Sequence, residues 1–450
     1  MADGGAPGEA VTAPSWVGAR LDGGGDWSLR AKAPVILGLL MLFDSWDSVV
    51  IAYTVPSISA QWSLTPLLSG SLISAGYGGQ FLGAILFGAL AERTGRLPVL
   101  RALVVLMSLL GIACAMTTRY EQLFACRLVQ GLAIGGALPV AISYINEIAP
   151  TPTRGRFFGT FQFLMASGFG LALLVSAWVV PAYGWRPMFA IGAVPLLLLP
   201  LTMPLPESPR WLAARGRVDE ALRSLMKLGG PDQVRPPADA AMPPVVRRVP
   251  FALLLAPGLR GQSIVTALLW FLTSLVSFGL VTWIPSIYVT MFRIPVADAL
   301  HYNIIVGISV FILPLILRAS IDRVGRRPPV ILGTAVGGIA LLAMIPVPIE
   351  QRVLLVGLAI IGQIGISVGS LILWPYTAEI YDTRIRSLAL GTASSLARGA
   401  SMLTPLLVGA VLQLTGTVTL VFLIFGIASL VVALLWWRAT RETAGRTMAD

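Results

Sequence analysis

Apolar residues run through this chain in blocks of about 20, separated by short polar connections. That is the length a helix needs to cross about 30 Å of hydrocarbon. The blocks predict membrane-spanning helices rather than strands, because an open strand would leave its backbone groups unpaired in lipid. We expect about twelve spans, at residues 33–53, 67–91, 99–117, 122–145, 157–180, 185–204, 262–290, 300–318, 328–347, 353–378, 387–412 and 416–437.

Composition agrees with this pattern. Of the 450 residues, 56% are hydrophobic and only 12% are charged, and the mean hydropathy is +0.82. A soluble domain carries about 25% charged residues. The chain is therefore expected to be an all-α membrane protein surrounded by the lipid bilayer.

The net charge of +11 reflects topology rather than nucleic-acid binding. Basic residues gather in every second connection, as at Arg93, Arg96 and Arg101, whereas the connections between hold one or none. This alternation follows the positive-inside rule. It predicts a protein of the cell inner membrane with both termini and the 205–260 connection in the cytoplasm.

These features divide the chain into five parts. We expect a disordered cytoplasmic tail over 1–32, since it has no apolar core of a signal peptide. A six-helix half over 33–204, a cytoplasmic loop over 205–260, a second six-helix half over 261–437 and a cytoplasmic tail over 438–450 follow. Both cysteines fall inside spans, so no disulfide framework is expected. The sequence suggests no metal site, no cofactor other than a coupling proton, and a functional monomer.

Two motifs occur twice. GALAERTGRLPVL begins at Gly88 and RASIDRVGRRPPVIL at Arg318, so that Glu92 aligns with Asp322 at an offset of 230. YINEIAPTPTRG begins at Tyr144 and YTAEIYDTRIRS at Tyr376, and here the glutamates align at an offset of 232. Two independent motifs at nearly one offset indicate two homologous six-helix halves.

These residues resemble the signature loops of the major facilitator superfamily. PESPRWL at 206–212 is similar to the sugar-porter and organic-ion branch. FDSWDSVV at 43–50 and LWFLTSLVSFGLVTWIPSIY at 269–288 resemble aromatic-acid/proton symporters and niacin-type carriers. The resemblance implies two pseudo-symmetric six-helix bundles. Two departures are Glu92, where the family usually has Asp, and the missing Gln-Gln-x-x-Gly-x-Asn motif of sugar porters in the seventh span.

The repeated loop charges predict a cytoplasmic gate. Arginine pairs bidentately with carboxylates, so acidic helix ends and arginines of the facing half are suited to hold the inside closed. The candidates are Glu92, Arg93, Arg96, Glu147, Arg154, Asp322, Arg323, Arg326, Glu379 and Arg386. The alternative is that they are solvated charges that only set topology.

Three charges in the first half suggest proton coupling. Asp44, Asp47 and Arg127 lie inside spans, where a charge costs at least about 2.5 kcal/mol. With a rise of about 1.5 Å per residue, Asp47 and Arg127 fall at nearly the same depth. Separation from Arg127 favours the protonated form of a desolvated Asp47, which makes the pair a candidate proton switch. Either aspartate is a candidate proton carrier, and a static ion pair is the alternative.

Arg398 is the candidate substrate anchor. It lies about 16 Å into the eleventh span, and its planar fork fits a carboxylate. The resemblance to organic-anion carriers, which have Arg at a matching point, supports this role. Bonding to backbone carbonyls or to Asp44 is the alternative. Further candidate binding residues are Gln80, Gln162, Gln363, Trp374 and Asn303.

The sequence thus predicts a transporter and not an enzyme. The favoured function is proton-coupled import of a small organic acid, aromatic or heterocyclic, by alternating access. A sugar or polyol symporter is the first alternative, and a non-transporting receptor or scaffold the second. The absence of a G-x-x-x-x-G-K-[ST] motif argues against an ATP-driven pump. The glycine runs at 76–79 and 131–136 are expected to pack helices, because Gly permits close approach.

Overall fold

The computed structural model describes residues 13–22, 28–229 and 250–443 of the chain. Its first part contains α1 (Ala13–Asp22), α2 (Ser28–Trp62), α3 (Pro66–Thr94), α4 (Arg96–Met116), α5 (Tyr120–Ile148), α6 (Arg154–Tyr183), α7 (Arg186–Ile191), α8 (Pro195–Leu198), α9 (Pro209–Ala214) and α10 (Val218–Lys227). The second part contains α11 (Arg260–Thr290), α12 (Val296–Val324), α13 (Arg327–Ala343), α14 (Arg352–Ile380), α15 (Thr383–Thr415) and α16 (Thr419–Ala439).

Length and composition identify the membrane-spanning helices. Among the described residues, ten helices are long and apolar enough to cross a membrane. Two shorter apolar segments, Arg186–Thr202 and Arg327–Ala343, lie where the sixth and ninth spans are predicted. The first of these is not one helix but α7, α8 and a 3-10 turn at Leu199–Thr202. The prediction of an all-α membrane fold is confirmed.

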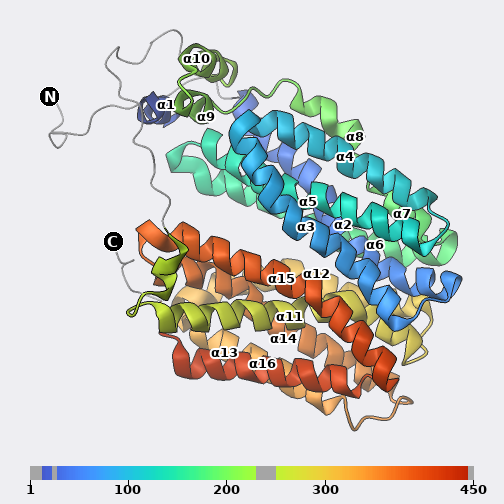
Figure 1. Cartoon of the computed structure of the whole chain (residues 1–450). Coiled ribbons are helices and arrows are strands. Elements are labelled where there is room, and N and C mark those ends of the chain that lie inside the picture. Colours follow the sequence, from blue (N-terminus) through green and yellow to red (C-terminus); the bar gives the residue numbers. More distant parts are fainter. Residues whose placement is uncertain (1–12, 23–27, 230–249, 444–450) are drawn as a thin grey trace.

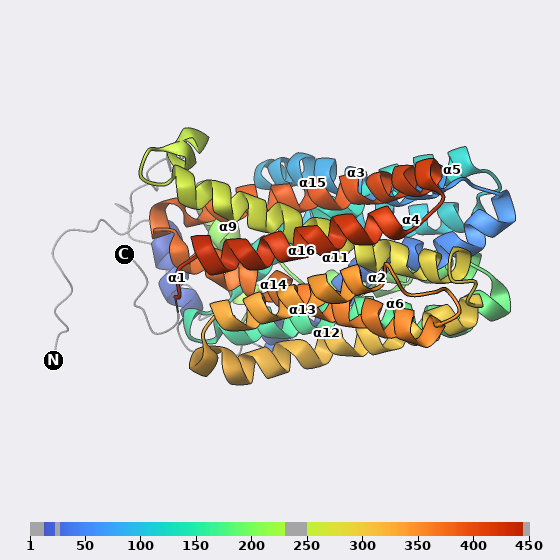
Figure 2. The ribbon, with the colours of Figure 1, turned by 90° about the horizontal axis from the view of Figure 1, so that it is seen from below.

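The spans form two bundles that lie side by side along a common axis. Figure 1 shows α2 to α8 as one bundle, the N-terminal half, above α11 to α16, the C-terminal half. Figure 2 shows the same helices running nearly parallel along the long axis. We call the end where α2 begins and α16 ends the terminal end, and the opposite end the distal end.

Glycines bring α3 and α5 close together. A Cβ on Gly79 would lie 2.9 Å from the Cα of Gly131, which is closer than real Cβ atoms approach a neighbour. Gly83 and Gly135 in turn meet backbone atoms of the facing helix. Small residues drive such packing in lipid, where no hydrophobic effect holds helices together. The expectation that these glycine runs pack helices is confirmed.

Contacts between the halves gather toward the distal end. The Ser74 hydroxyl donates to the Met402 carbonyl at 2.7 Å, and the Leu67 N–H donates to Gln413 at 3.3 Å. One apolar cluster there includes residues of both halves, such as Ile58 and Ile287. Two clusters nearer the terminal end, in contrast, each belong to one half. The halves therefore close the bundle at its distal end.

The expected disordered tail contains a helix, which corrects the prediction for part of 1–32. Val17 and Leu21 of α1 are buried in one cluster with Trp211 of α9 and Leu225 of α10. Asp22 accepts a hydrogen bond from the Thr151 N–H at 2.7 Å, and this bond lowers the pKa of Asp22. Residues 1–12 and 23–27 of the predicted tail lie outside the described part of the chain.

Candidate functional site

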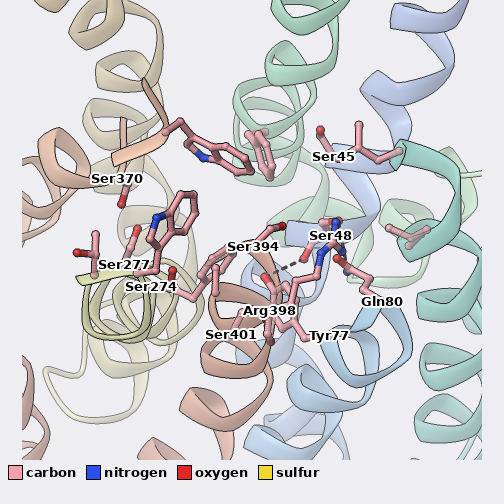
Figure 3. A pocket seen from close by; sticks show the side chains of 18 of the residues that line it. Ser45, Ser48, Tyr77, Gln80, Ser274, Ser277, Ser370, Ser394, Arg398 and Ser401 are labelled. Carbon is pink, nitrogen blue, oxygen red and sulfur yellow. Dashed lines mark hydrogen bonds between the residues drawn. The ribbon is translucent and has the colours of Figure 1, made fainter. Parts of the chain in front are cut away.

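A cavity of about 330 Å³ lies between the two halves. That volume is at the lower end of the range of about 300–1,000 Å³ for small-molecule sites. Both halves supply its walls, with α2, α3, α5 and α6 on one side and α11, α14 and α15 on the other. Figure 3 shows hydroxyl groups on both walls, at Ser45 and Ser48 and at Ser274, Ser277 and Ser370.

Two opposite charges from different halves line this cavity. Asp44 on α2 and Arg398 on α15 both belong to the wall, and their charges act on each other. Asp44 is 5% exposed, and its Oδ1 has no hydrogen-bond partner among the described residues. Ser394 and Ser401 flank Arg398 on the same face of α15, since they lie four residues before and three after it. The cavity thus offers a cation that an anionic ligand can reach.

Asp47 and Arg127 form a second polar cluster, inside the N-terminal half. Both are essentially fully buried, and neither is among the described residues that line the cavity. Arg127 Nη1 donates to the Gln130 side chain at 2.8 Å and to the backbone carbonyl of Asp47 at 3.2 Å. Asp47 and Arg127 therefore lie next to each other as expected, but the guanidinium bonds to the backbone carbonyl of Asp47 and not to its carboxylate. Neither carboxylate oxygen of Asp47 has a hydrogen-bond partner among the described residues.

Aromatic rings form much of the remaining wall. Trp270 and Trp374 meet edge to face, with ring centroids 4.7 Å apart. The Trp270 indole N–H donates to Thr377 at 2.9 Å, which fixes that ring. Phe278 contacts Tyr77 of the other half in a similar edge-to-face arrangement at 5.6 Å. Such rings offer flat apolar faces to a ring-shaped ligand.

The five predicted binding residues other than Arg398 fall into two groups: two line the cavity, and three do not. Gln80 and Trp374 line the cavity, as Arg398 does. Gln162 is exposed on α6, Gln363 is buried away from the cavity, and Asn303 donates to the Ala299 carbonyl at 2.7 Å. None of these three is among the residues that line the cavity in this conformation, and their role in binding stays a prediction. Depth within a span locates a residue along the helix but not on a particular face of it.

The predicted gate charges lie at the terminal end. Arg96 pairs with Glu147 at 3.0 Å, and Arg326 pairs with Glu379 at 3.1 Å. These pairs occupy equivalent places in the two repeats, and each joins residues of one half. The expectation of pairing with the facing half therefore does not describe this conformation.

The other gate candidates have various surroundings. Glu92, Arg93 and Arg323 are exposed, although the Glu92 carbonyl accepts hydrogen bonds from Trp211 and Arg215. Arg154 is half-buried, and its charge acts on Asp22 of α1. Arg386 donates to the Tyr381 carbonyl at 3.3 Å. The side chain of Asp322 lies outside the described part of the structure.

Two further glutamates, which were not predicted, cap the starts of α4 and α13. Glu207 accepts hydrogen bonds from the N–H groups of Ser208 and Leu97, at the start of α4. Glu442 accepts from Arg326 and Arg327, at the start of α13. Burial raises the pKa of Glu207, although the bonds from Ser208 and Leu97 oppose that effect. The repeated Glu-Ser and Glu-Thr pairs at 207–208 and 442–443 are the sequence signal that would have found them.

Comparison with known proteins gives one consistent result. The family model described as "Sugar (and other) transporter" matches residues 36–450. The niacin transporter NiaP of Acinetobacter baylyi is 30% identical over 92% of this chain and 94% of that protein. The gallate transporter of Pseudomonas putida is 29% identical over 89% of each chain. The crystal structure of a D-xylose-proton symporter matches 94% of this chain and 100% of that chain with a TM-score of 0.74 and 23% identity.

Proposed function

This chain belongs to the sugar (and other) transporter family of the major facilitator superfamily, and from that premise we propose a specific cargo and coupling ion. It is a multi-pass membrane protein and a secondary transporter. The proposed function is import of a small aromatic or heterocyclic carboxylate together with protons, by alternating access across the cell inner membrane.

The observation that carries the proposal is Arg398 in a cavity with aromatic walls. A permanent cation in the cavity wall favours an anionic ligand, and the guanidinium fork binds a carboxylate bidentately. Trp270 and Trp374 provide ring faces beside it. The names of the niacin and gallate transporters agree with such a ligand, since each names an aromatic or heterocyclic acid.

Asp47 is the proposed proton carrier, with Asp44 as the other candidate. Both carboxylate oxygens of Asp47 are buried without hydrogen-bond partners among the described residues, and a buried ionised carboxylate costs free energy unless it is paired. The guanidinium of Arg127 is held beside it by Gln130 and by the Asp47 carbonyl. A rearrangement that moves Arg127 against or away from the carboxylate would release or bind a proton.

We further propose that the terminal end faces the cytoplasm. The described arginine clusters lie there, including Arg210, Arg215, Arg217 and Arg223 of the 205–260 connection, as the positive-inside rule requires. With the distal contacts closed, the structure then corresponds to a state open toward the cytoplasm. Reporter fusions after Asp450 and within the 205–260 connection should both read cytoplasmic, and a periplasmic signal from either would contradict this topology.

A sugar or polyol symporter is the second candidate. The solved structure with the same fold transports D-xylose with protons, and serines are numerous in the cavity wall. A neutral sugar, however, brings no anionic group to the Arg398 guanidinium, whereas a carboxylate does. The charge of Arg398 therefore favours the acid.

Ligand binding to the purified full-length protein tests whether the site takes an aromatic acid or a sugar. Isothermal titration calorimetry with benzoate, benzamide and D-xylose compares an aromatic acid, its neutral isostere and a sugar. We expect benzoate to bind and the other two to bind at least about tenfold more weakly, because a charge-assisted hydrogen bond is worth ~1.5–3 kcal/mol. Equal binding of benzamide, or preferential binding of D-xylose, would contradict the proposal.

A further inference from the structure

A short 3-10 helix, η3 (Phe251–Leu255), comes just before α11 at the terminal end. Three of its five side chains are large, apolar and exposed, with exposed fractions of 56% for Phe251, 40% for Leu253 and 54% for Leu255. Leu254, in contrast, is 4% exposed and packs in one cluster with residues at the junction of α14 and α15. One leucine thus holds η3 to the C-terminal half, while its apolar neighbours face outward.

Hydrogen bonds fix the chain between η3 and α11. The Ala256 N–H donates to the Leu253 carbonyl at 3.2 Å, and the Arg260 N–H donates to the Ala256 carbonyl at 2.9 Å. The Gln262 side chain donates to the Ile380 carbonyl at 2.8 Å, which ties the first turn of α11 to the end of α14. Backbone groups that are already bonded lower the cost of placing a segment at a membrane surface. The exposed side chains of η3 therefore lie on a turn that is held in place and internally bonded.

The length of α11 places η3 at the depth of a membrane surface. The 31 residues of α11 span about 46 Å at about 1.5 Å per residue, whereas the hydrocarbon core is about 30 Å thick and the whole bilayer about 40–45 Å. The first turns of α11 therefore lie among the lipid headgroups. Since η3 ends at Leu255 and α11 begins at Arg260, η3 lies at nearly the same depth.

The position of η3 beside the bundle favours lipid as its partner. Figure 2 shows the yellow-green segment before α11 turned to the side of the bundle at the terminal end. Ile264 and Leu268, in the first turns of α11, are also exposed and apolar, and neither is among the described residues that line the cavity. They lie four residues apart and so share one face of α11. The apolar surface of η3 is thus followed along the chain by a lipid-facing side of α11.

We propose that η3 anchors the terminal end of the C-terminal half in the membrane surface. Phe251, Leu253 and Leu255 insert between the acyl chains of the near leaflet, while Leu254 stays in the protein. The exposed Arg260 lies at the level of the headgroups, where a basic residue suits anionic lipids. The connection between the halves thus enters the membrane surface before α11 begins. Neither the cargo nor the coupling ion takes part in this contact.

Spin-label accessibility in nanodiscs tests the anchor. Nitroxide labels on the single variants Leu253→Cys and Leu255→Cys of the full-length protein would meet two reagents, oxygen, which concentrates in lipid, and a water-soluble nickel chelate. Nanodiscs of phosphatidylethanolamine and phosphatidylglycerol supply the bilayer. We expect both labels to collide with oxygen far more than with nickel, as a label at Ile264→Cys on α11 should. Labelled wild-type protein measures the background from Cys114 and Cys126.

Asp219→Cys is the matched water-facing control. Asp219 is exposed on α10, also in the cytoplasmic connection, and its label should collide mainly with nickel. All four substituted positions are exposed, so a cysteine at any of them removes no core contact. Two results would overturn the anchor. Labels at 253 and 255 that resemble the Asp219→Cys label would place η3 in water, and labels that neither reagent reaches would show that protein covers it.

Discussion

Two carboxylates three positions apart on α2 lie in different surroundings. Asp44 lines the cavity, opposite Arg398 of the other half. Asp47 is 0% exposed and lies with Arg127 and Gln130, inside its own half. Three residues turn the helix by about 300°, so the two side chains point only about 60° apart. Their different surroundings come from the neighbouring elements, since Asp44 meets the cavity and Asp47 meets Arg127.

This difference assigns different roles to the two groups. A ligand on Arg398 replaces Asp44 as the counter-charge and contacts both halves, so its binding energy can depend on how the halves are arranged. The Asp47 cluster, in contrast, lies within one half, and none of its residues is among those that line the cavity. We therefore propose that substrate acts first on Asp44 and Arg398, and that the proton acts on Asp47. The experiments below change one region at a time.

Arg398 should show the largest effect on binding. Arg398→Ala removes the only described cationic side chain of the cavity wall, and we expect the Kd of the acid to rise roughly 100-fold. Arg398→Lys keeps the charge but loses the fork, and should recover part of that loss. Calorimetry with benzoate measures both. Unchanged affinity in the Ala variant would make Arg398 a structural residue.

Asp44 should show a smaller effect of opposite sign. Asp44→Asn removes the anion that competes with substrate for Arg398, so the acid should bind about three- to tenfold more tightly at pH 8, on the order of one partly screened charge pair. Ser45→Ala, next to it on the wall, is the control. Weaker binding in the Asn variant would show that Asp44 holds the ligand rather than competing with it.

The terminal-end ion pairs should show the smallest effects. Glu147→Gln and Glu379→Gln break equivalent pairs in the two halves, with side chains 19% and 21% exposed. Each should lower the free energy of unfolding by about 1 kcal/mol, because partly exposed pairs contribute little. Glu220→Gln in the exposed Arg217–Glu220 pair is the control and should be closer to neutral. A large loss in only one half would show that the repeats are not mechanically equivalent.

Sequence patterns predicted much of this architecture. Apolar block length gave the spans, and the repeated loops identified the residues of Arg96–Glu147 and Arg326–Glu379 as gate candidates, although their pairing within each half was not predicted. Helical rise placed Asp47 at the depth of Arg127, which the structure brings together. These features depend on length and charge, both of which can be read along the chain.

The remaining features depend on which face of a helix meets which neighbour. Gln162 is at mid-span but exposed, because its depth does not reveal its direction. The helix at Ala13–Asp22 is stabilised by Trp211, far along the chain. The sequence did not single out the serines that line the cavity, because serines inside apolar helices usually bond to their own backbone. Such contacts require the three-dimensional packing.

The coupling role of Asp47 is tested most directly in proteoliposomes. Radiolabelled benzoate would be followed in two assays, accumulation driven by an imposed pH gradient and exchange against internal unlabelled benzoate. For Asp47→Asn, we expect accumulation no higher than equilibrium together with measurable exchange, since the substrate site at Arg398 is intact. Accumulation that still follows the pH gradient in this variant would show that Asp47 does not couple transport to protons.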